Sequence, residues 1–208
     1  MTSTDIFDRF PRLHLGAFNC AVDHWINTDV TRHIWVSRIP LAARALHMCR
    51  LMGAERYREH REGRFRKLRY MDLTKPLPFP DRSISAVFSA HVFEHLFPDE
   101  VEALTREIAR VIVPGGVCRV VVPDLERIVA SYDVAQPYTF IRQMFEVERR
   151  SSAAFAHHWA FTRPSLNSLF QAAGFTETAV TNYRVGRCPD LAQLDNRPDE
   201  SIFFEAIK

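Results

Sequence analysis

Apolar and polar positions are patterned most clearly in the middle of the chain, where they predict a strand, a helix and a second strand. Residues 84–88 form an apolar run that is too short for a helix and suits a strand buried on both faces. Residues 99–112 place apolar side chains at helical spacing, and Pro114-Gly115-Gly116 is expected to stop that helix. Residues 117–122 form a second apolar run. This order predicts a parallel crossover, because two adjacent parallel strands need a helical connection of this kind.

Similar runs on both sides of this unit complete a mostly parallel sheet. Residues 175–183 and 202–207 are expected to be two closing strands, separated by the polar loop 186–200. The other predicted strands cover residues 13–16, 25–29 and 65–71, and the other predicted helices cover residues 41–52, 125–132, 136–150 and 162–170. We therefore predict an α/β protein of one domain, residues 1–208, with helices on both faces of the sheet.

The carboxyl ends of the predicted strands carry residues that suit a ligand site. In open parallel sheets the ligand crevice lies beyond these ends, so we expect Asp72, the segment 89–91 and Asp124 to share one edge. The first strand ends at Gly16, a residue type that lets a ligand approach the backbone closely. The second strand ends at Asp29, an acid that can accept hydrogen bonds from ribose hydroxyls. Both features are typical of nucleotide-binding α/β sheets.

Three segments, in the same order and at similar spacing, resemble the central part of class I S-adenosylmethionine-dependent methyltransferases. That family reads roughly D-L-x-x-L-P-F-x-D, S-x-x-L-E-H and R-V-L-K-P-G-G where this chain has Asp72 to Asp81, Ser89 to Leu96, and Arg110 to Gly116. The resemblance implies a Rossmann-like sheet with a C-terminal antiparallel hairpin, and a helical insertion at about 125–160 beside the substrate pocket or a dimer contact. It also implies S-adenosylmethionine as the cofactor, held by Gly16, Asp29, Asp72, Leu73, Ser89, Ala90 and His91.

The first turn departs from the family pattern. The family has two or three glycines there, whereas this chain reads Gly16-Ala17-Phe18-Asn19-Cys20. Side chains at Ala17 and Phe18 would crowd a ligand pressed against the backbone. Residues 17–24 are also too few for a crossover helix, so either the helix is reduced to a turn or the strands pair differently. The alternative hypothesis is therefore a catalytically inactive methyltransferase-like protein that serves as a binding or scaffold module.

Methyl transfer asks little of side chains beyond holding the reacting atoms in line and excluding water. For a hydroxyl acceptor a general base would help, and histidine suits that role near neutral pH. The candidates are His91, which follows the fourth strand, and the pair His157 and His158. For any single one of them, the pattern favours a structural, hydrogen-bonded role over catalysis. The expected reaction is methyl transfer to a small polar acceptor, such as the hydroxyl of a sugar or another metabolite.

The segment from His91 to His95 also matches H-x-x-E-H, a signature of zinc proteases in which the two histidines bind the metal. A zinc protease needs a third ligand far along the chain and a long helix around the motif. Here Pro98 ends the segment within one turn. The sequence alone therefore favours a loop after the strand that lines the methyl-donor pocket, and it predicts no metal ligands.

Composition limits the remaining classes of protein. The 27 basic and 25 acidic residues give a net charge of +2, which argues against a dedicated nucleic-acid binder, and the basic run at 56–69 is expected to be solvated. Four separated cysteines indicate neither a disulfide framework nor a zinc cluster. No apolar run is long enough for a membrane span. We expect a cytoplasmic protein that acts on a small molecule, and the stripe of Phe140, Met144 and Val147 leaves a homodimer contact open.

Overall fold

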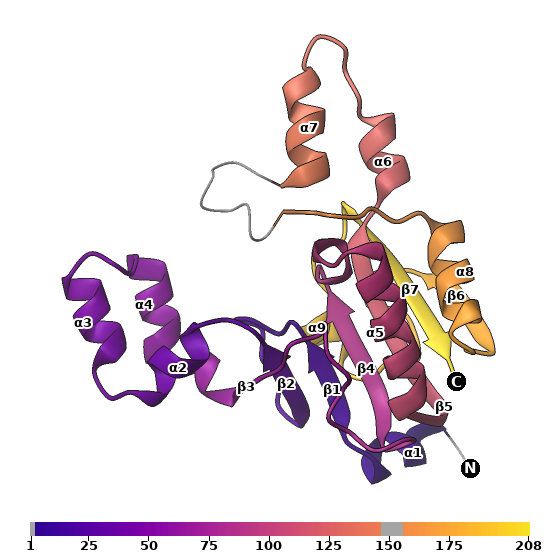
Figure 1. Ribbon diagram of the computed structural model, residues 1–208, viewed down its shortest axis with the longest axis horizontal. Coiled ribbons are helices and arrows are strands. Elements are labelled where there is room, and N and C mark those ends of the chain that lie inside the picture. Colours follow the sequence, from indigo (N-terminus) through magenta and orange to yellow (C-terminus); the bar gives the residue numbers. More distant parts are fainter. Residues whose placement is uncertain (1–2, 147–155) are drawn as a thin grey trace.

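The computed structural model describes residues 3–146 and 156–208 and shows one seven-stranded sheet in the order β3-β2-β1-β4-β5-β7-β6 (Figure 1). The strands are β1 (Arg12–Leu15), β2 (Trp25–Asp29), β3 (Leu68–Tyr70), β4 (Ile84–Ala90), β5 (Ile112–Pro123), β6 (Glu177–Thr181) and β7 (Ser201–Ile207). The pairs among β1 to β5 are all parallel, and β7 lies antiparallel between β5 and β6. The predicted mostly parallel sheet with a C-terminal antiparallel hairpin is confirmed.

Helices cover both faces of the sheet, as the sequence predicted. The helical elements are α1 (Ser3–Arg9), α2 (His33–Arg38), α3 (Ala42–Met48), α4 (Ala54–Arg61), η1 (Arg64–Lys67), η2 (Phe93–His95), α5 (Pro98–Val111), α6 (Leu125–Ala130), α7 (Pro137–Phe145), α8 (Arg163–Ala172) and α9 (Leu191–Leu194). On one face α5 and α8 bury side chains such as Ile108 and Phe170. On the other face Phe7 of α1 and Leu191 of α9 pack over Phe88. The parallel strands are therefore apolar on both faces.

A turn replaces the helix that would normally connect the first two strands. β1 and β2 are adjacent and parallel, so the sequence alternative of a helix reduced to a turn is confirmed. The buried side chain of Asn27 fastens this turn, because it accepts a hydrogen bond from Val22 N at 2.9 Å and donates to Val22 O at 2.8 Å. Its amide oxygen also lies 3.2 Å from Nδ1 of His14. The hydrogen bonds of the Asn27 side chain thus stabilise the short connection between β1 and β2. The carboxyl ends of both strands therefore lie at one edge of the sheet.

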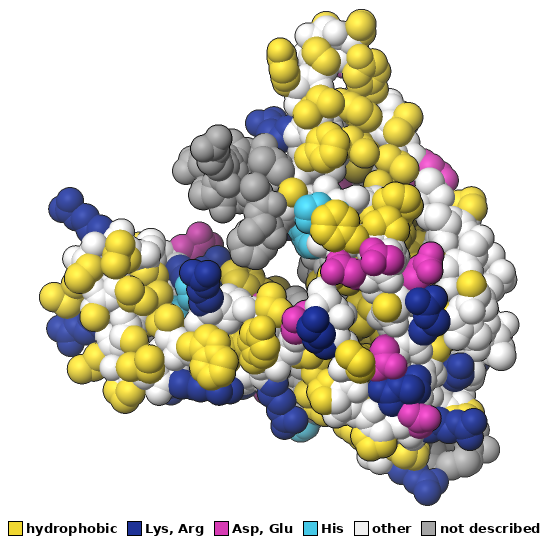
Figure 2. Space-filling model, in the orientation of Figure 1, with side chains coloured by type: hydrophobic (Ala, Val, Ile, Leu, Met, Phe, Trp, Pro, Cys, Tyr) yellow, Lys and Arg dark blue, Asp and Glu magenta, His cyan; other side chains and the backbone are white. Residues whose placement is uncertain are grey.

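Several predicted elements differ from the structure. The strand expected at 65–71 is reduced to β3, because residues 64–67 form η1. Helix α3 ends at Met48 instead of residue 52, and none of its residues is buried. Leu41 and Met48 are more than 70% exposed. Apolar side chains lie over the arm formed by α2, α3 and α4, at the left of Figure 2. The arm of α2, α3 and α4 extends beyond the sheet, so a core does not cover the apolar side of α3. Helix α5 ends before Pro114, whose segment is already part of β5.

Helices α6 and α7 stand beyond the carboxyl edge of the sheet, near the top of Figure 1. They contact each other through Tyr132 and Phe140, whose ring centroids are 5.2 Å apart. The predicted helix at 136–150 corresponds to α7, and its last predicted stripe residue, Val147, lies outside the described residues. Among the described residues, no helix is long and apolar enough to cross a membrane. That this arm is an insertion that shapes a substrate pocket stays a prediction.

A buried ion network lies at the antiparallel end of the sheet. Arg119 of β5 is fully buried and donates to both carboxylate oxygens of Asp195, at 2.8 and 2.6 Å. It also donates to Glu205 at 3.1 Å. Its remaining contacts are with Thr181 Oγ1, Asn182 O and Val185 O. A guanidinium with all its donors engaged is the form in which an arginine can be buried, because each unpaired donor would carry a desolvation cost.

Candidate active site

The strand register brings several predicted site residues to one edge of the sheet. Leu15 pairs with both Thr28 and Ser89, so the next residues along these parallel strands, Gly16, Asp29 and Ala90, lie side by side. Asp29 in turn pairs with Tyr70, two residues before Asp72. We call this edge, with Gly16, Asp29, Asp72, Leu73 and residues 89–91, the donor edge.

Asp29 holds the turns on both sides of it. One carboxylate oxygen accepts from Thr31 N at 2.7 Å, and the other accepts from Phe18 N at 3.0 Å. Burial raises the pKa of this carboxyl group, and the two backbone hydrogen bonds oppose that effect. Each carboxylate oxygen has two acceptor positions, so one on each oxygen stays open. Asp29 can therefore hold the local backbone and still accept from the two hydroxyls of a ribose.

Gly16 has a positive φ of 67°, and the structure shows what this glycine permits. A Cβ atom on Gly16 would lie 2.2 Å from Cγ2 of Val92, so the turn after β4 rests directly against its backbone. Phe18, two residues on, contacts other side chains. Its ring packs against Phe65, at a centroid distance of 5.8 Å, and lies beneath the guanidinium of Arg56. The close approach to Gly16 is thus made by a residue of the chain itself.

Asp72 accepts hydrogen bonds from both the backbone N and the hydroxyl of Thr74, at 3.0 and 2.8 Å. These bonds lower the pKa of Asp72. It therefore stabilises its own turn, which is one of the roles that such an acid plays in a loop. Leu73 beside it is partly buried against the main core. At the end of β4, Ser89 is buried, and its Oγ has no hydrogen-bond partner among the described residues. That buried hydroxyl gives the donor edge a free polar group.

His91 connects the donor edge to a pocket. Its backbone has a φ of 53° and donates to Val121 O of β5 at 2.9 Å. The ring places Nδ1 3.2 Å from Glu94 Oε1 and Nε2 3.1 Å from Ser201 Oγ. Because the carboxylate only accepts, Nδ1 carries the hydrogen, and Nε2 presents its lone pair to a hydroxyl group.

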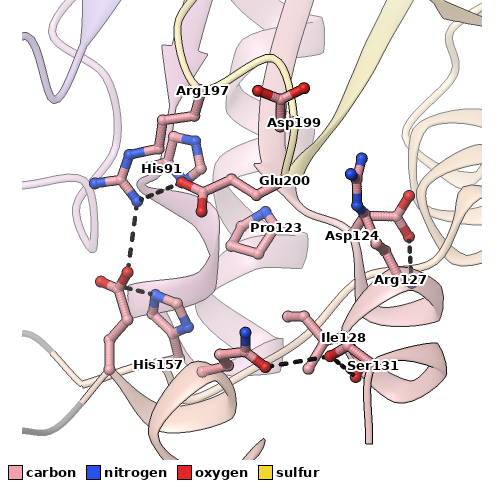
Figure 3. A pocket seen from close by; sticks show the side chains of 12 residues that line it. His91, Pro123, Asp124, Arg127, Ile128, Ser131, His157, Arg197, Asp199 and Glu200 are labelled. Atoms are coloured by element: carbon pink, nitrogen blue, oxygen red, sulfur yellow. Dashed lines mark hydrogen bonds and ion pairs between the residues drawn. The ribbon is translucent and has the colours of Figure 1, made fainter. Parts of the chain in front are cut away.

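The pocket has a volume of about 230 Å³ and lies beyond β5, between the loop 195–200 and the arm of α6 and α7 (Figure 3). Its polar lining comes mainly from His91, Asp124, Glu146, His157, Arg197 and Glu200. Arg197 lies 3.5 Å from Glu146 and 3.4 Å from Glu200, so it bridges the two sides. The sequence indicated only His91, Asp124 and His157. Glu146 lies in the segment expected to be a helix and Arg197 in the polar loop 186–200, and no motif marks either residue.

His157 and His158 have different surroundings. His157 is buried, and its Nε2 lies 3.4 Å from Glu146 Oε2. Burial by itself lowers the pKa of His157, but the hydrogen bond to Glu146 and the charge of Glu94 outweigh it, and the net pKa is raised. The same hydrogen bond lowers the pKa of Glu146 to about 2. His158 is exposed, stacks on Phe97 at a centroid distance of 4.3 Å, and does not line the pocket.

Comparisons with known proteins agree with this geometry. Residues 39–120 match a sequence family described as "Methyltransferase domain". A protein of Thermotoga maritima described as a SAM-dependent methyltransferase and possible histamine N-methyltransferase superposes with a TM-score of 0.54 at 15% identity, over 96% of this chain and 82% of that one. The YcgJ protein of Bacillus subtilis gives a TM-score of 0.50 at 16% identity, over 96% and 92%.

A possible exported protein of Bordetella parapertussis gives a TM-score of 0.54 at 11% identity, over 99% of this chain, which spans 65% of that protein. At these identities the solved structures establish the fold, and the family match over residues 39–120 adds the sequence evidence. The matched segment contains Asp72, residues 89–91 and the Pro-Gly-Gly segment. With the strand order of the whole sheet, this match supports the resemblance of the chain to class I S-adenosylmethionine-dependent methyltransferases.

Proposed function

We propose that the protein transfers the methyl group of S-adenosylmethionine to a small polar acceptor, a hydroxyl group of a sugar or a similar metabolite. The observation that carries this proposal is the pocket of about 230 Å³ beside the donor edge, whose lining includes several charged residues. A pocket of this size suits a small molecule. Its lining of carboxylates, arginines and histidines suits a ligand with many hydrogen-bonding groups. His91 belongs both to the donor edge and to the pocket wall.

The donor would be held by residues whose hydrogen-bonding capacity is incomplete. Asp29 has an open acceptor position on each oxygen, and Ser89 Oγ is buried without a partner among the described residues. Asp72 and Leu73 contribute the neighbouring turn. When bound, S-adenosylmethionine supplies an activated methyl group on a sulfonium. What the protein must add is alignment and exclusion of water.

His91 is the residue that we assign as proton acceptor. Glu94 orients the ring through Nδ1, and Nε2 faces a hydroxyl, that of Ser201, along the wall of the pocket. An acceptor hydroxyl that takes the place of the Ser201 hydroxyl would give its proton to Nε2. Hydrogen-bond contact of this kind is what a general base requires. His157 and His158 stay candidates by sequence, but His157 faces Glu146 and His158 lies outside the pocket.

The test is calorimetric titration with S-adenosylmethionine and with its demethylated product, followed by transfer of a radiolabelled methyl group to a panel of hydroxylated metabolites. We expect both ligands to bind and at least one acceptor to be labelled. No binding at millimolar ligand would overturn the proposal and favour the binding or scaffold module. Binding without transfer to any hydroxylated acceptor would contradict the acceptor class alone.

The single glycine of the first turn calls for a variant of its own. In Val92→Ala the side chain that rests on Gly16 is shortened. If S-adenosylmethionine binds Val92→Ala but not the natural protein, the turn blocks the donor, and the inactive module is the correct assignment.

A further inference from the structure

Three potential metal ligands meet beside the pocket, and one of them, Glu94, also orients His91. A carboxylate oxygen of Glu94 and one ring nitrogen each of His95 and His157 lie within 4.8 Å of one another. Glu94 and His95 belong to η2, directly after β4, whereas His157 comes from the segment that returns from the arm of α6 and α7. Backbone hydrogen bonds from His158 N and Trp159 N to Glu94 O, at 2.7 and 3.2 Å, hold the two segments together.

Both rings are oriented as they are in metal sites. Nδ1 of His95 lies 3.2 Å from Ala156 O, and Nδ1 of His157 lies 3.2 Å from Met144 O. A carbonyl oxygen only accepts, so each Nδ1 donates, and the Nε2 of a neutral His95 keeps a lone pair. Nε2 of His157 donates to Glu146, so a bound ion would displace the hydrogen from this nitrogen. In metal sites a ligating histidine almost always donates its other N–H to a carbonyl, a carboxylate or water, which fixes the ring.

Glu94 supplies a second, independent observation. Its side chain is 1% exposed, and its Oε2 has no hydrogen-bond partner among the described residues. The other oxygen is held by His91. A buried carboxylate oxygen without a partner is costly, because it has lost its water and gained nothing in return. Such a group in a folded protein needs an explanation, and an unseen ion is one of them.

We propose that Glu94, His95 and His157 bind a divalent transition-metal ion of the Zn²⁺ type. Two imidazoles and one carboxylate are the ligand types that zinc accepts, whereas Ca²⁺ and Mg²⁺ prefer oxygen ligands only. Three protein ligands leave one position of a tetrahedral ion open. His157 lines the pocket, and Glu146 Oε2 lies 3.4 Å from its Nε2, so a further carboxylate is close to the ligand set.

This site differs from the protease signature that the same segment resembles. In that signature both histidines of H-x-x-E-H bind the metal and the glutamate acts as a base. Here Glu94 takes the place of the first histidine as a ligand, and His91 orients Glu94. His157, far along the chain, provides the third ligand.

The test uses untagged protein, treated with a chelator and dialysed, without any methyl donor. ZnCl₂ is titrated calorimetrically, and CoCl₂ is added to a second sample whose visible absorption reports tetrahedral coordination. We expect one ion per chain, a dissociation constant in the micromolar range or tighter, and the intense bands of tetrahedral Co²⁺. Because the readout is metal binding, failure here leaves the methyl-transfer proposal untouched.

Three variants remove one ligand each: Glu94→Gln, His95→Gln and His157→Gln. Each should weaken Zn²⁺ binding by about 100-fold or more and change the Co²⁺ spectrum, since loss even of a residue that only supports a ligand costs 10–100-fold. The matched control is His158→Gln, the exposed neighbour of His157, which should bind as the natural protein does. Thermal unfolding monitored by circular dichroism confirms that each variant is folded. The proposal is overturned if the natural protein binds no stoichiometric ion, or if folded ligand variants bind it as tightly as the control.

Discussion

The donor edge and the pocket beside it are built in different ways. At the donor edge, Asp29 and Asp72 accept hydrogen bonds from backbone only two residues further along the chain. In the pocket region, His91 reaches Ser201 and His95 reaches the carbonyl of Ala156, over separations of 110 and 61 residues. Part of the donor edge is therefore held by turns that close within a few residues. The pocket region exists only when segments distant in sequence have come together.

This difference extends to charge. Asp29 and Asp72 of the donor edge accept hydrogen bonds from backbone N–H groups, and Asp72 also accepts from the Thr74 hydroxyl. Their carboxylates keep further acceptor positions. Two acids near the pocket and at the antiparallel end of the sheet, Glu146 and Asp195, face a histidine and an arginine side chain from other segments. Long-range ionic contacts should therefore dominate the stability of the C-terminal half, whereas changes at the donor edge should act on ligand binding.

The largest effect is expected for Arg119→Leu. Removal of the guanidinium leaves Asp195 and Glu205 buried without their partner, and an unpaired buried charge costs about 3–5 kcal/mol. Urea unfolding monitored by circular dichroism should show this loss. The control is Arg106→Leu, whose side chain is 62% exposed and 3.5 Å from Glu102, with an expected change of less than about 1 kcal/mol. Equal losses of unfolding free energy in both variants would contradict the expected difference between the buried and the exposed ion pair.

The next effect concerns pH and comes from His14, in the parallel half of the sheet. Burial lowers the pKa of this ring from 6.5 to about 4. Between pH 4 and 6.5, His14 binds a proton in the unfolded chain but not in the folded protein. The stability should therefore fall as the pH is lowered from 6.5 to 4. The contribution is up to about 3 kcal/mol. The stability difference between the natural protein and His14→Gln, measured across this range, should show it, whereas His24→Gln, at an exposed position, should show none.

His91→Gln tests the residue shared by both regions. Loss of the proton acceptor should lower kcat by about 100-fold, at the low end of what a general base contributes, with little change in the affinity for the donor. Ser201→Ala serves as the comparison, because it frees Nε2 of His91 without removing the base. If His91→Gln retains its full turnover rate, or Ser201→Ala loses as much, the assignment of His91 is wrong.

The smallest effect is expected at Asp29. Asp29→Asn keeps one acceptor oxygen but loses the charge, and we expect about tenfold weaker binding of S-adenosylmethionine, near the cost of one charged hydrogen bond. Asp133 has the same local role, because it accepts from Ala135 N at 2.8 Å in the loop between α6 and α7. Asp133→Asn is therefore the matched control, with unchanged donor affinity in calorimetry. A similar loss in both variants would mean that Asp29 has only a structural role.

The sequence predicted those parts of the fold whose signals are local. The strand at 25–29 agrees with β2 at both ends, and the helix expected at 99–112 differs from α5 by one residue at each end. The same reasoning left the surroundings of α3 open, because apolar spacing shows that one face is apolar but not that anything covers it. It also took residues 117–122 as simply apolar, although Arg119 is buried among them. That arginine is tolerated only because Asp195 and Glu205 fold against it.

The sequence by itself determined the parallel crossover, the positions of Gly16, Asp29 and Asp72 at strand ends, and the family resemblance, because periodicity, turn residues and short motifs act over a few residues. Tertiary structure alone decided that Val92 rests on Gly16, that Glu146 and Arg197 complete the pocket, and that His157 joins Glu94 and His95. Such contacts link segments that the sequence does not mark as neighbours. Whether a buried polar group is stable depends on what the rest of the chain places against it.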